Sequence, residues 1–173
     1  MNKFDALGQA SWLWCNSILH SEWPVSGIAQ YLIPPIERGQ YEIITVEGLP
    51  VAYCTWAFFS KSAEAKYLLD PSSIDLSAWT SGDRLWFIDW VSPFSNAHTL
   101  ALKNAMGRRF EGTLARALRV KPGRKVARVM EFKGATIEWP EARGLFEGYK
   151  RELLLTLGRS AIASSVKEEN TIE

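Results

Sequence analysis

The sequence predicts an α/β (α+β) domain in which a mixed central sheet is flanked by helices. Helix-like and strand-like segments alternate along the chain instead of forming separate blocks, which favours a sheet covered by helices. The chain has 173 residues, the length of one domain. Its residues are 47% hydrophobic and include eight Trp and eight Phe, enough to build a core. We expect one domain over 1–160 and a flexible tail over 161–173.

The N-terminal part predicts two helices. In order, its expected elements are a helix over 4–16, a turn over 17–23 and a helix over 25–32. Asp5 lies near the first helix start, and Pro24 suits a first helical position. Pro34 and Pro35 are expected to break the second helix, because proline lacks the backbone N–H that a helix interior needs.

Strands dominate the middle of the chain. The expected elements, in order, are strands over 41–46 and 51–59, a helix over 63–69, a strand over 84–91, a helix over 100–110, strands over 114–120 and 126–132, and a helix from Pro140. Glu47-Gly48 predicts a hairpin turn between the first two strands. The apolar run 84–91 indicates a buried central strand. In the last helix, Phe146, Tyr149 and Leu153 recur at helical spacing and predict one apolar face, which Leu157 continues.

Charge and hydropathy narrow the function classes. The formal net charge is +1, so no global attraction to nucleic acid is expected. The longest apolar run, 49–59, is far shorter than the ~20 residues of a spanning helix, and the N-terminus lacks the apolar stretch of a signal peptide. We therefore expect a soluble, cytoplasmic protein without stable membrane insertion.

The two cysteines, Cys15 and Cys54, do not form a disulfide scaffold. Buried, reduced thiols are the simpler interpretation, and a nucleophilic thiol is the alternative. No Cys-x-x-Cys pair is present, so no metal site is expected. The sequence also lacks a P-loop, a dinucleotide fingerprint and a nucleophile elbow.

Candidate catalytic groups are few, because the chain has only two histidines. His20 follows the first helix, three residues after Ser17, and is either structural or a general base. Asp89 interrupts the apolar strand 84–91. A buried carboxylate needs compensation, either from a structural hydrogen bond, to backbone or to Arg84, or from a histidine that it orients.

A basic segment over 116–128 contains no acidic residue. On a hairpin it would form either a solvated edge that prevents sheet aggregation or a docking surface for an acidic partner. No nucleic-acid-binding motif accompanies it. The basic residues are Arg116, Arg119, Lys121, Arg124, Lys125 and Arg128.

Long sequence blocks, several of them containing tryptophan, are the most specific feature of the sequence. They read, in order, LGQASWLWCNSILHSEWPVSGIAQYLIPPIERGQY, EGLPVAYCTWAFFS, EAKYLLDPSSI, WTSGDRLWFIDWVSPF, ARALRVKPG and VARVMEFKG. Over about residues 6–155 the chain resembles the RTX toxin-activating lysine acyltransferases, the hemolysin-activating C proteins.

The resemblance implies a fold related to the GCN5-type N-acetyltransferases. It also implies a fatty acyl group delivered as the 4′-phosphopantetheine thioester of acyl carrier protein, with no permanently bound cofactor. The acceptors would be internal lysines of an RTX protoxin, which becomes the active toxin, and a homodimer is suggested. The family's essential histidine and strand aspartate correspond to His20 and Asp89, and its serine to Ser17.

These residues suggest a mechanism. Deprotonating a free lysine at pH 7 costs about 4.6 kcal/mol, so a base is needed. His20 would take the proton, Asp89 would orient the imidazole, and Ser17 would bind the oxyanion or position His20. An acyl-enzyme on Ser17 or His20 is the rival route.

Partners and alternatives follow from the same features. Acyl carrier protein is acidic, so Arg116, Arg119, Lys121 and Arg124 form the expected dock. The acyl chain requires an apolar groove, to which Trp56, Phe58 and Trp86 would contribute unless they belong to the core. Two other functions stay open: an acyl-CoA-dependent N-acyltransferase acting on a small amine, and a non-enzymatic toxin chaperone.

Overall fold

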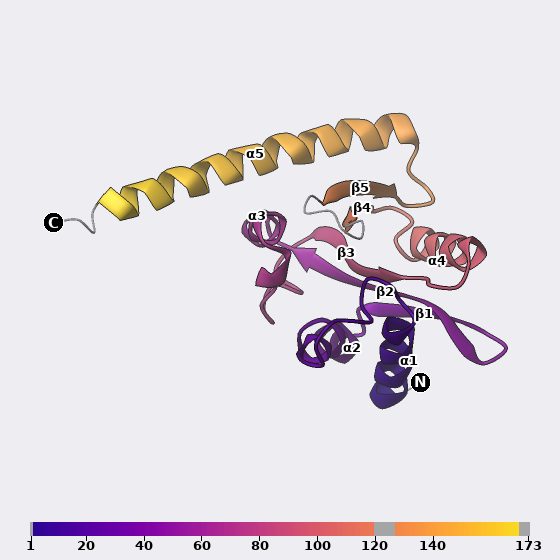
Figure 1. The fold of residues 1–173 in the computed structure, drawn as a ribbon. Helices are drawn as coiled ribbons and strands as arrows, with labels where there is room; N and C mark the ends of the chain where they lie inside the picture. The colour runs from indigo at the N-terminus through magenta and orange to yellow at the C-terminus, as the bar shows by residue number, and fades with distance from the viewer. Residues whose placement is uncertain (1, 120–126, 170–173) are drawn as a thin grey trace.

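A five-stranded sheet with helices on both faces forms the body of the protein. A computed structural model describes residues 2–119 and 127–169. Its elements, shown in Figure 1, are α1 (Lys3–Cys15), the π-helical segment η1 (Ile28–Leu32), α2 (Ile33–Arg38), β1 (Tyr41–Val46), β2 (Leu49–Phe59), α3 (Lys61–Leu69), the 3₁₀ turn η2 (Pro71–Ser73), β3 (Arg84–Val91), α4 (Asn96–Arg109), β4 (Leu114–Arg119), β5 (Arg128–Lys133) and α5 (Trp139–Glu169).

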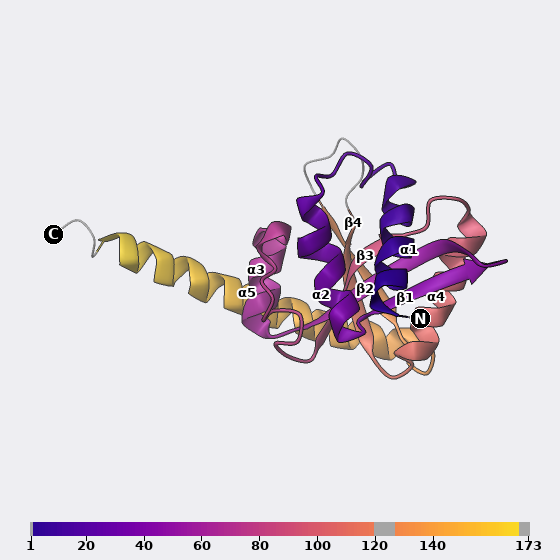
Figure 2. The same ribbon diagram turned by 90° about the horizontal axis from the view of Figure 1, so that it is seen from below.

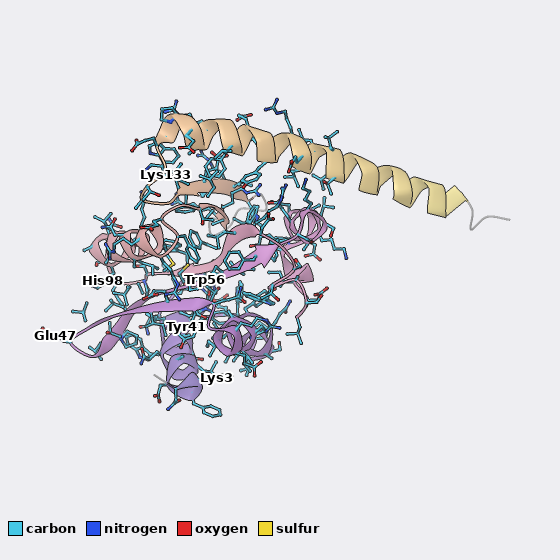
Figure 3. All side chains as sticks on the ribbon, turned by 180° about the vertical axis from the view of Figure 1, so that it is seen from behind. Lys3, Tyr41, Glu47, Trp56, His98 and Lys133 are labelled. Atoms are coloured by element: carbon cyan, nitrogen blue, oxygen red, sulfur yellow. The ribbon has the colours of Figure 1, made fainter. Side chains whose placement is uncertain are left out.

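The sheet is mixed, as the sequence predicted. Its strand order is β1-β2-β3-β4-β5, and all neighbours are antiparallel except β3 and β4. The predicted turn joins β1 to β2, with Glu47 and Gly48 both at positive φ. Figure 3 shows Glu47 at the outer end of this hairpin.

Helices cover the two faces of the sheet unequally. Leu102 and Met106 of α4 pack on one face, against β2, β3 and β4. The other face is covered by α1 and α2 over β1 and β2, by α3 over β2 and β3, and by α5 beside β4. Figure 2 shows α1 and α2 side by side over the strands. This arrangement is consistent with the predicted acetyltransferase-like fold.

The parallel strands β3 and β4 pair only over a short stretch. Their register runs from Leu85↔Ala115 to Phe87↔Ala117 and then ends. Beyond that point β3 continues to Val91 beside β2 alone. The two strands therefore separate, and each leaves a backbone edge facing the gap.

A β-bulge in β3 decides where Asp89 points. Thr55 pairs with Asp89 and Trp56 pairs with Phe87, so Ile88 is the extra residue. Without the bulge, strict alternation would place Asp89 on the α4 face together with Leu85 and Phe87. The inserted residue shifts the alternation, and Asp89 instead lies on the same face as Thr55, beneath α1.

The helix before β1 departs from the prediction. Pro34 and Pro35 do not end it; they lie in the first turn of α2, which continues to Arg38. The first residues of a helix need no intrahelical N–H donor, so proline is tolerated there. The π-helical turn η1, with Ile33 N–H bonded to Ile28 C=O, leads directly into α2. Gly39, with φ of 67°, terminates the helix.

The last helix begins at Trp139, one residue before the predicted Pro140, and extends to Glu169. Its predicted apolar face is confirmed: Phe146 is buried, and Tyr149, Leu153 and Leu157 are half-buried. Beyond its contact with α3 the helix projects from the body (Figure 1). The domain boundary near residue 160 and the flexible tail over 161–173 stay predictions.

Candidate active site

His20 lies in a series of tight turns that follow α1. The backbone N–H of Ser17 donates to Trp14 C=O, and the N–H groups of His20 and Ser21 donate to Ser17 C=O. The turns bring the His20 ring back over the end of α1, where only 6% of the residue is exposed. Among the described residues, this is the imidazole that meets a carboxylate.

That carboxylate belongs to Asp89. His20 Nε2 lies 3.3 Å from Asp89 Oδ1, and Asp89 is only 8% exposed. The backbone N–H of Asp89 donates to Thr55 Oγ1 at 3.2 Å, which holds the strand in the bulged register. Two residues that are 69 positions apart in the sequence thus form one buried pair.

Ser17 completes a chain of three side chains. Its Oγ lies 2.8 Å from His20 Nδ1. An ionised carboxylate only accepts hydrogen bonds, so Nε2 carries the proton toward Asp89. Nδ1 is then an acceptor, and the Ser17 hydroxyl donates to it. The connectivity Ser17–His20–Asp89 is that of a serine–histidine–aspartate triad, with the roles of the two ring nitrogens exchanged.

Two tryptophans that the sequence analysis did not single out frame the imidazole. Trp14 stacks on His20 with ring centroids 4.9 Å apart, and its indole Nε1 donates to Asp89 Oδ2 at 2.6 Å. Trp23 meets the ring of His20 edge-on at 4.7 Å. A spacing of three residues separates Trp14, Ser17 and His20, and this spacing is the local signal that could have grouped them. The contact with Asp89 depends on tertiary structure and has no local signal.

A cavity of about 790 Å³ opens beside this cluster. It lies where β3 and β4 separate, with Ile88 to Trp90 on one side and Ala117 to Arg119 on the other. Residues of α3 and α4 both line it, so it passes through the gap from one face of the sheet to the other. Its size suits a small-molecule site. Much of its wall is aromatic or aliphatic: Trp14, Trp23, Phe87, Trp90, Met130 and Phe132.

The residues expected to form an acyl groove belong to the core instead. Trp56 and Trp86 are buried, Phe58 packs against the same core as Trp56, and none of the three lines the cavity. Figure 3 shows Trp56 in the interior of the body. Part of the aromatic wall of the cavity comes instead from Phe87 and Trp90 of β3 and from Phe132 of β5, whereas Trp56 and Phe58 lie on β2.

The cysteines do not join the site. Burial raises the pKa of the Cys54 thiol well above its usual value, and the negative charge of Asp89 adds to this effect. Cys54 is therefore a buried, protonated thiol. Cys15 is exposed and does not line the cavity. In the part of the chain that the structure describes, no group of three or more His, Cys, Asp or Glu side chains is placed to hold a metal ion.

The prediction that Arg116 belongs to a docking surface is wrong. Arg116 is only 5% exposed and forms an ion pair with the fully buried Glu64. Its guanidinium lies between the rings of Trp86 and Tyr149, at 4.9 Å from each centroid. The alternation of β4 points this side chain toward α3 and α5, so a partner protein has no access to it.

Arg84 belongs to the same buried network and not to Asp89. It pairs with Glu64 and with Glu152 of α5. The structural alternative in which Arg84 compensates Asp89 is therefore excluded. Two arginines, Arg84 and Arg116, thus face two glutamates, so the charges of the network are matched. Glu64 also accepts a hydrogen bond from Trp86 Nε1 at 2.7 Å.

Arg119 differs from Arg116, because it is exposed and lines the cavity. It pairs with Arg128 across β4 and β5, which places two cations at the same end of the hairpin. Lys121 and Arg124, the other residues expected to bind acyl carrier protein, lie outside the described residues.

Within the described helices, none is long and apolar enough to cross a membrane.

Comparisons with known proteins show the family of this chain. Residues 1–133 match the model of the RTX toxin acyltransferase family. The chain is 41% identical over 159 residues to the protein-lysine palmitoyltransferase CyaC of Bordetella bronchiseptica, covering 92% of this chain and 86% of that protein. It is 43% identical over 162 residues to the protein-lysine myristoyltransferase HlyC of Escherichia coli, covering 93% and 94%.

A third relative has a name of the same kind. The leukotoxin-activating lysine-acyltransferase LktC of Mannheimia haemolytica is 41% identical over 155 residues, covering 89% of this chain and 92% of the relative. The matched residues of the family model include His20, Asp89 and the separating strands. The chain belongs to the RTX toxin acyltransferase family.

Proposed function

We propose that this protein transfers a fatty acyl group from acyl carrier protein to internal lysine side chains of an RTX protoxin, and so activates the toxin. The observation that carries the proposal is the buried His20–Asp89 pair at the wall of a largely apolar cavity. The names of the relatives support it, since they are protein-lysine acyltransferases and toxin-activating proteins. The donor is a co-substrate, so the reaction requires no resident cofactor.

The gap between β3 and β4 suits the donor. A 4′-phosphopantetheine arm is extended and contains amides, and unpaired strand edges bind such chains through backbone hydrogen bonds. β3 offers an edge beyond Phe87, and β4 offers one beyond Ala117. The aromatic wall beside these edges then takes the acyl chain, which gains by leaving water.

The acidic carrier protein docks, in this proposal, at the exposed cations around the cavity. Arg119 of β4 and Lys103 of α4 both line the cavity and are exposed. Arg128 lies beside Arg119 on the hairpin, and Lys121 and Arg124 follow β4 in sequence. Such contacts raise the association rate and weaken with salt. Because the proposed donor is a cytoplasmic protein, we expect the reaction to take place in the cytoplasm.

The triad carries the proton transfer. The neutral ε-amine of the acceptor lysine attacks the thioester carbonyl, and a C–N bond forms. The amine proton passes to Ser17 Oγ while the hydroxyl proton moves to His20 Nδ1, over the 2.8 Å contact between these atoms. The charged imidazole is stabilised by Asp89 through Nε2. The C–S bond then breaks, and the thiol of the carrier leaves with the proton from His20.

The same contact also supports the acyl-enzyme route. If His20 removes the Ser17 proton before lysine arrives, Ser17 Oγ can take the acyl group itself and pass it on. We favour the relay, because Ser17 contacts His20 but is not among the residues that line the cavity to which we assign the acyl chain. Mass spectrometry of the enzyme after incubation with donor alone distinguishes the two routes.

The test uses purified protein, an RTX protoxin and two donors. Palmitoyl-acyl carrier protein and palmitoyl-CoA are supplied in parallel, and acylated lysines are counted by peptide mass spectrometry. We expect lysine acylation with the carrier-protein donor and much slower reaction with the CoA donor. Equal rates would contradict the proposed donor. Toxin activation without any acyl-lysine would favour the chaperone, and acylation of a small amine but not of the protoxin would favour the other transferase.

A further inference from the structure

Trp14 contacts both members of the catalytic pair. It lies in the last turn of α1 and is 5% exposed. Its indole N–H donates to Asp89 Oδ2 at 2.6 Å, while its ring plane lies 18° from that of His20, with centroids 4.9 Å apart. One side chain thus holds the carboxylate through its edge and the imidazole through its face.

We propose that Trp14 is a positioning residue that fixes the orientation of the Asp89 carboxylate and stabilises the imidazolium formed on His20 during the reaction. The proposal rests on the proposed function, because it assigns Trp14 to the same proton transfer. The positioning role extends the proposed function, because Trp14 acts on the proton transfer through Asp89 and His20.

The carboxylate argument follows from counting its partners. Asp89 has two oxygens, and the bulge fixes only its backbone, through the bond to Thr55. The side-chain torsion is set by Trp14 on Oδ2 and His20 on Oδ1. A hydrogen bond to a charged group in a buried site is stronger than one between neutral groups. Without the indole N–H, the carboxylate is free to rotate and Oδ1 leaves the axis of the imidazole Nε2–H.

The imidazole argument follows from the stacking. An aromatic face attracts a cation, and tryptophan is the strongest of the three aromatic residues in this respect. In the proposed transfer His20 takes a proton and becomes positively charged, so the attraction increases as the reaction proceeds. Differential stabilisation of this kind raises kcat and leaves ground-state binding unchanged.

The experiment replaces Trp14 with Phe, which keeps an aromatic face and removes the N–H donor. The matched control is Trp12→Phe, the same change two residues earlier on α1, where the ring is half exposed against Phe94 and does not line the cavity. We measure kcat, the KM for the acyl carrier protein donor, the rate–pH profile and Tm for both variants.

Trp14→Phe is expected to lower kcat by about ten- to a hundredfold, the range for losing a hydrogen bond to a charged group. The KM for the donor is expected to change less than kcat, since Phe keeps an aromatic face in the wall of the cavity. The acidic limb of the rate–pH profile should move to lower pH, because the protonated imidazole loses stabilisation. Trp12→Phe should match the wild type in all of these measurements.

A kcat and pH profile unchanged in Trp14→Phe, or changed equally in Trp12→Phe, would overturn the positioning role. If Trp14→Phe is unfolded at the assay temperature, benzothienylalanine at position 14 decides, since it replaces the N–H by sulfur and keeps the bicyclic ring. His20→Ala is assayed alongside. Wild-type enzyme that yields no acyl-lysine rejects the proposed function, and activity retained in His20→Ala rejects its catalytic pair. Activity lost in His20→Ala but kept in the Trp14 variants rejects only the positioning role.

Discussion

Replacing Asp89 with Asn removes one charge from the site and keeps the size and shape of the side chain. The amide oxygen can still accept the hydrogen bond from Trp14, but the amide NH2 then faces His20 Nε2. Two donors repel there, so the imidazole is driven to the tautomer protonated at Nδ1, which no longer accepts from Ser17. The variant therefore removes the charge and the acceptor that face the imidazole, and keeps the packing.

The structure sets the size of the effect. His20 Nε2 and Asp89 Oδ1 are 3.3 Å apart, and both residues are buried. At an effective dielectric constant of about 20, unit charges at this separation attract by about 5 kcal/mol. Each 1.36 kcal/mol is tenfold in rate, so the full loss corresponds to about three to four orders of magnitude in kcat. The same substitution in a serine–histidine–aspartate triad has an effect of this order.

The assay is single-turnover transfer from acyl carrier protein to an RTX protoxin, followed by mass spectrometry of the acylated lysines. Circular dichroism and Tm show whether the variant is folded. We expect a folded protein whose kcat is reduced by about 10³-fold or more. A folded Asp89→Asn protein that keeps more than about a tenth of wild-type kcat would show that Asp89 does not stabilise charge on the imidazole.

Three further changes test separate parts of the account. Ser17→Ala is expected to lower kcat about 10²- to 10⁴-fold, because the proton relay is removed. The intact mass of the wild-type enzyme after incubation with donor alone should show no acyl adduct. An adduct that Ser17→Ala abolishes would instead identify Ser17 as the residue that carries the acyl group. Arg119→Glu should raise the KM for acyl carrier protein and weaken the salt dependence of that KM. The control Arg143→Glu, on the exposed side of α5, should change neither. Equal effects of the two variants would show that acyl carrier protein binds at another surface. Tyr53→Phe should raise the free energy of unfolding, measured by urea titration, by about 1 kcal/mol. The reason is that the buried Tyr53 hydroxyl has no hydrogen-bond partner among the described residues. A lower free energy of unfolding would mean that the hydroxyl forms a hydrogen bond.

Most of the secondary structure followed from local patterns. Alternation predicted β1 and β2, and Glu47-Gly48 correctly predicted the turn between them. The helix-breaking role assigned to Pro34 and Pro35 was wrong, because a proline ends a helix only where an N–H is needed. The preceding π-helical turn, which makes these prolines first-turn residues, has no recognisable signature in the sequence.

The site was predicted only in part. Asp89 was visible as the one acidic residue in an apolar strand, and His20 as one of two histidines. What aims Asp89 at His20 is the extra residue Ile88, and a bulge depends on the pairing register with β2, which the sequence of β3 alone does not specify. The indole bond from Trp14 to Asp89 joins residues 75 positions apart and depends on the same register.

Arg116 shows why a basic segment is a poor guide to a surface. In sequence it is equivalent to Arg119, and both lie on β4. Burial of Arg116 depends on Glu64 of α3 and on the rings of Trp86 and Tyr149, which come from three other elements. Local charge patterns do not distinguish a buried, paired arginine from an exposed one.

The most direct test of the whole account is acyl-lysine formation by His20→Ala. The protoxin is incubated with acyl carrier protein donor and either wild-type or variant enzyme, and its acylated lysines are quantified by mass spectrometry. The account predicts that the wild type acylates the protoxin and that the folded variant yields no acyl-lysine above the uncatalysed level. A folded His20→Ala protein that acylates lysine at the wild-type rate would contradict the central role of the His20–Asp89 pair.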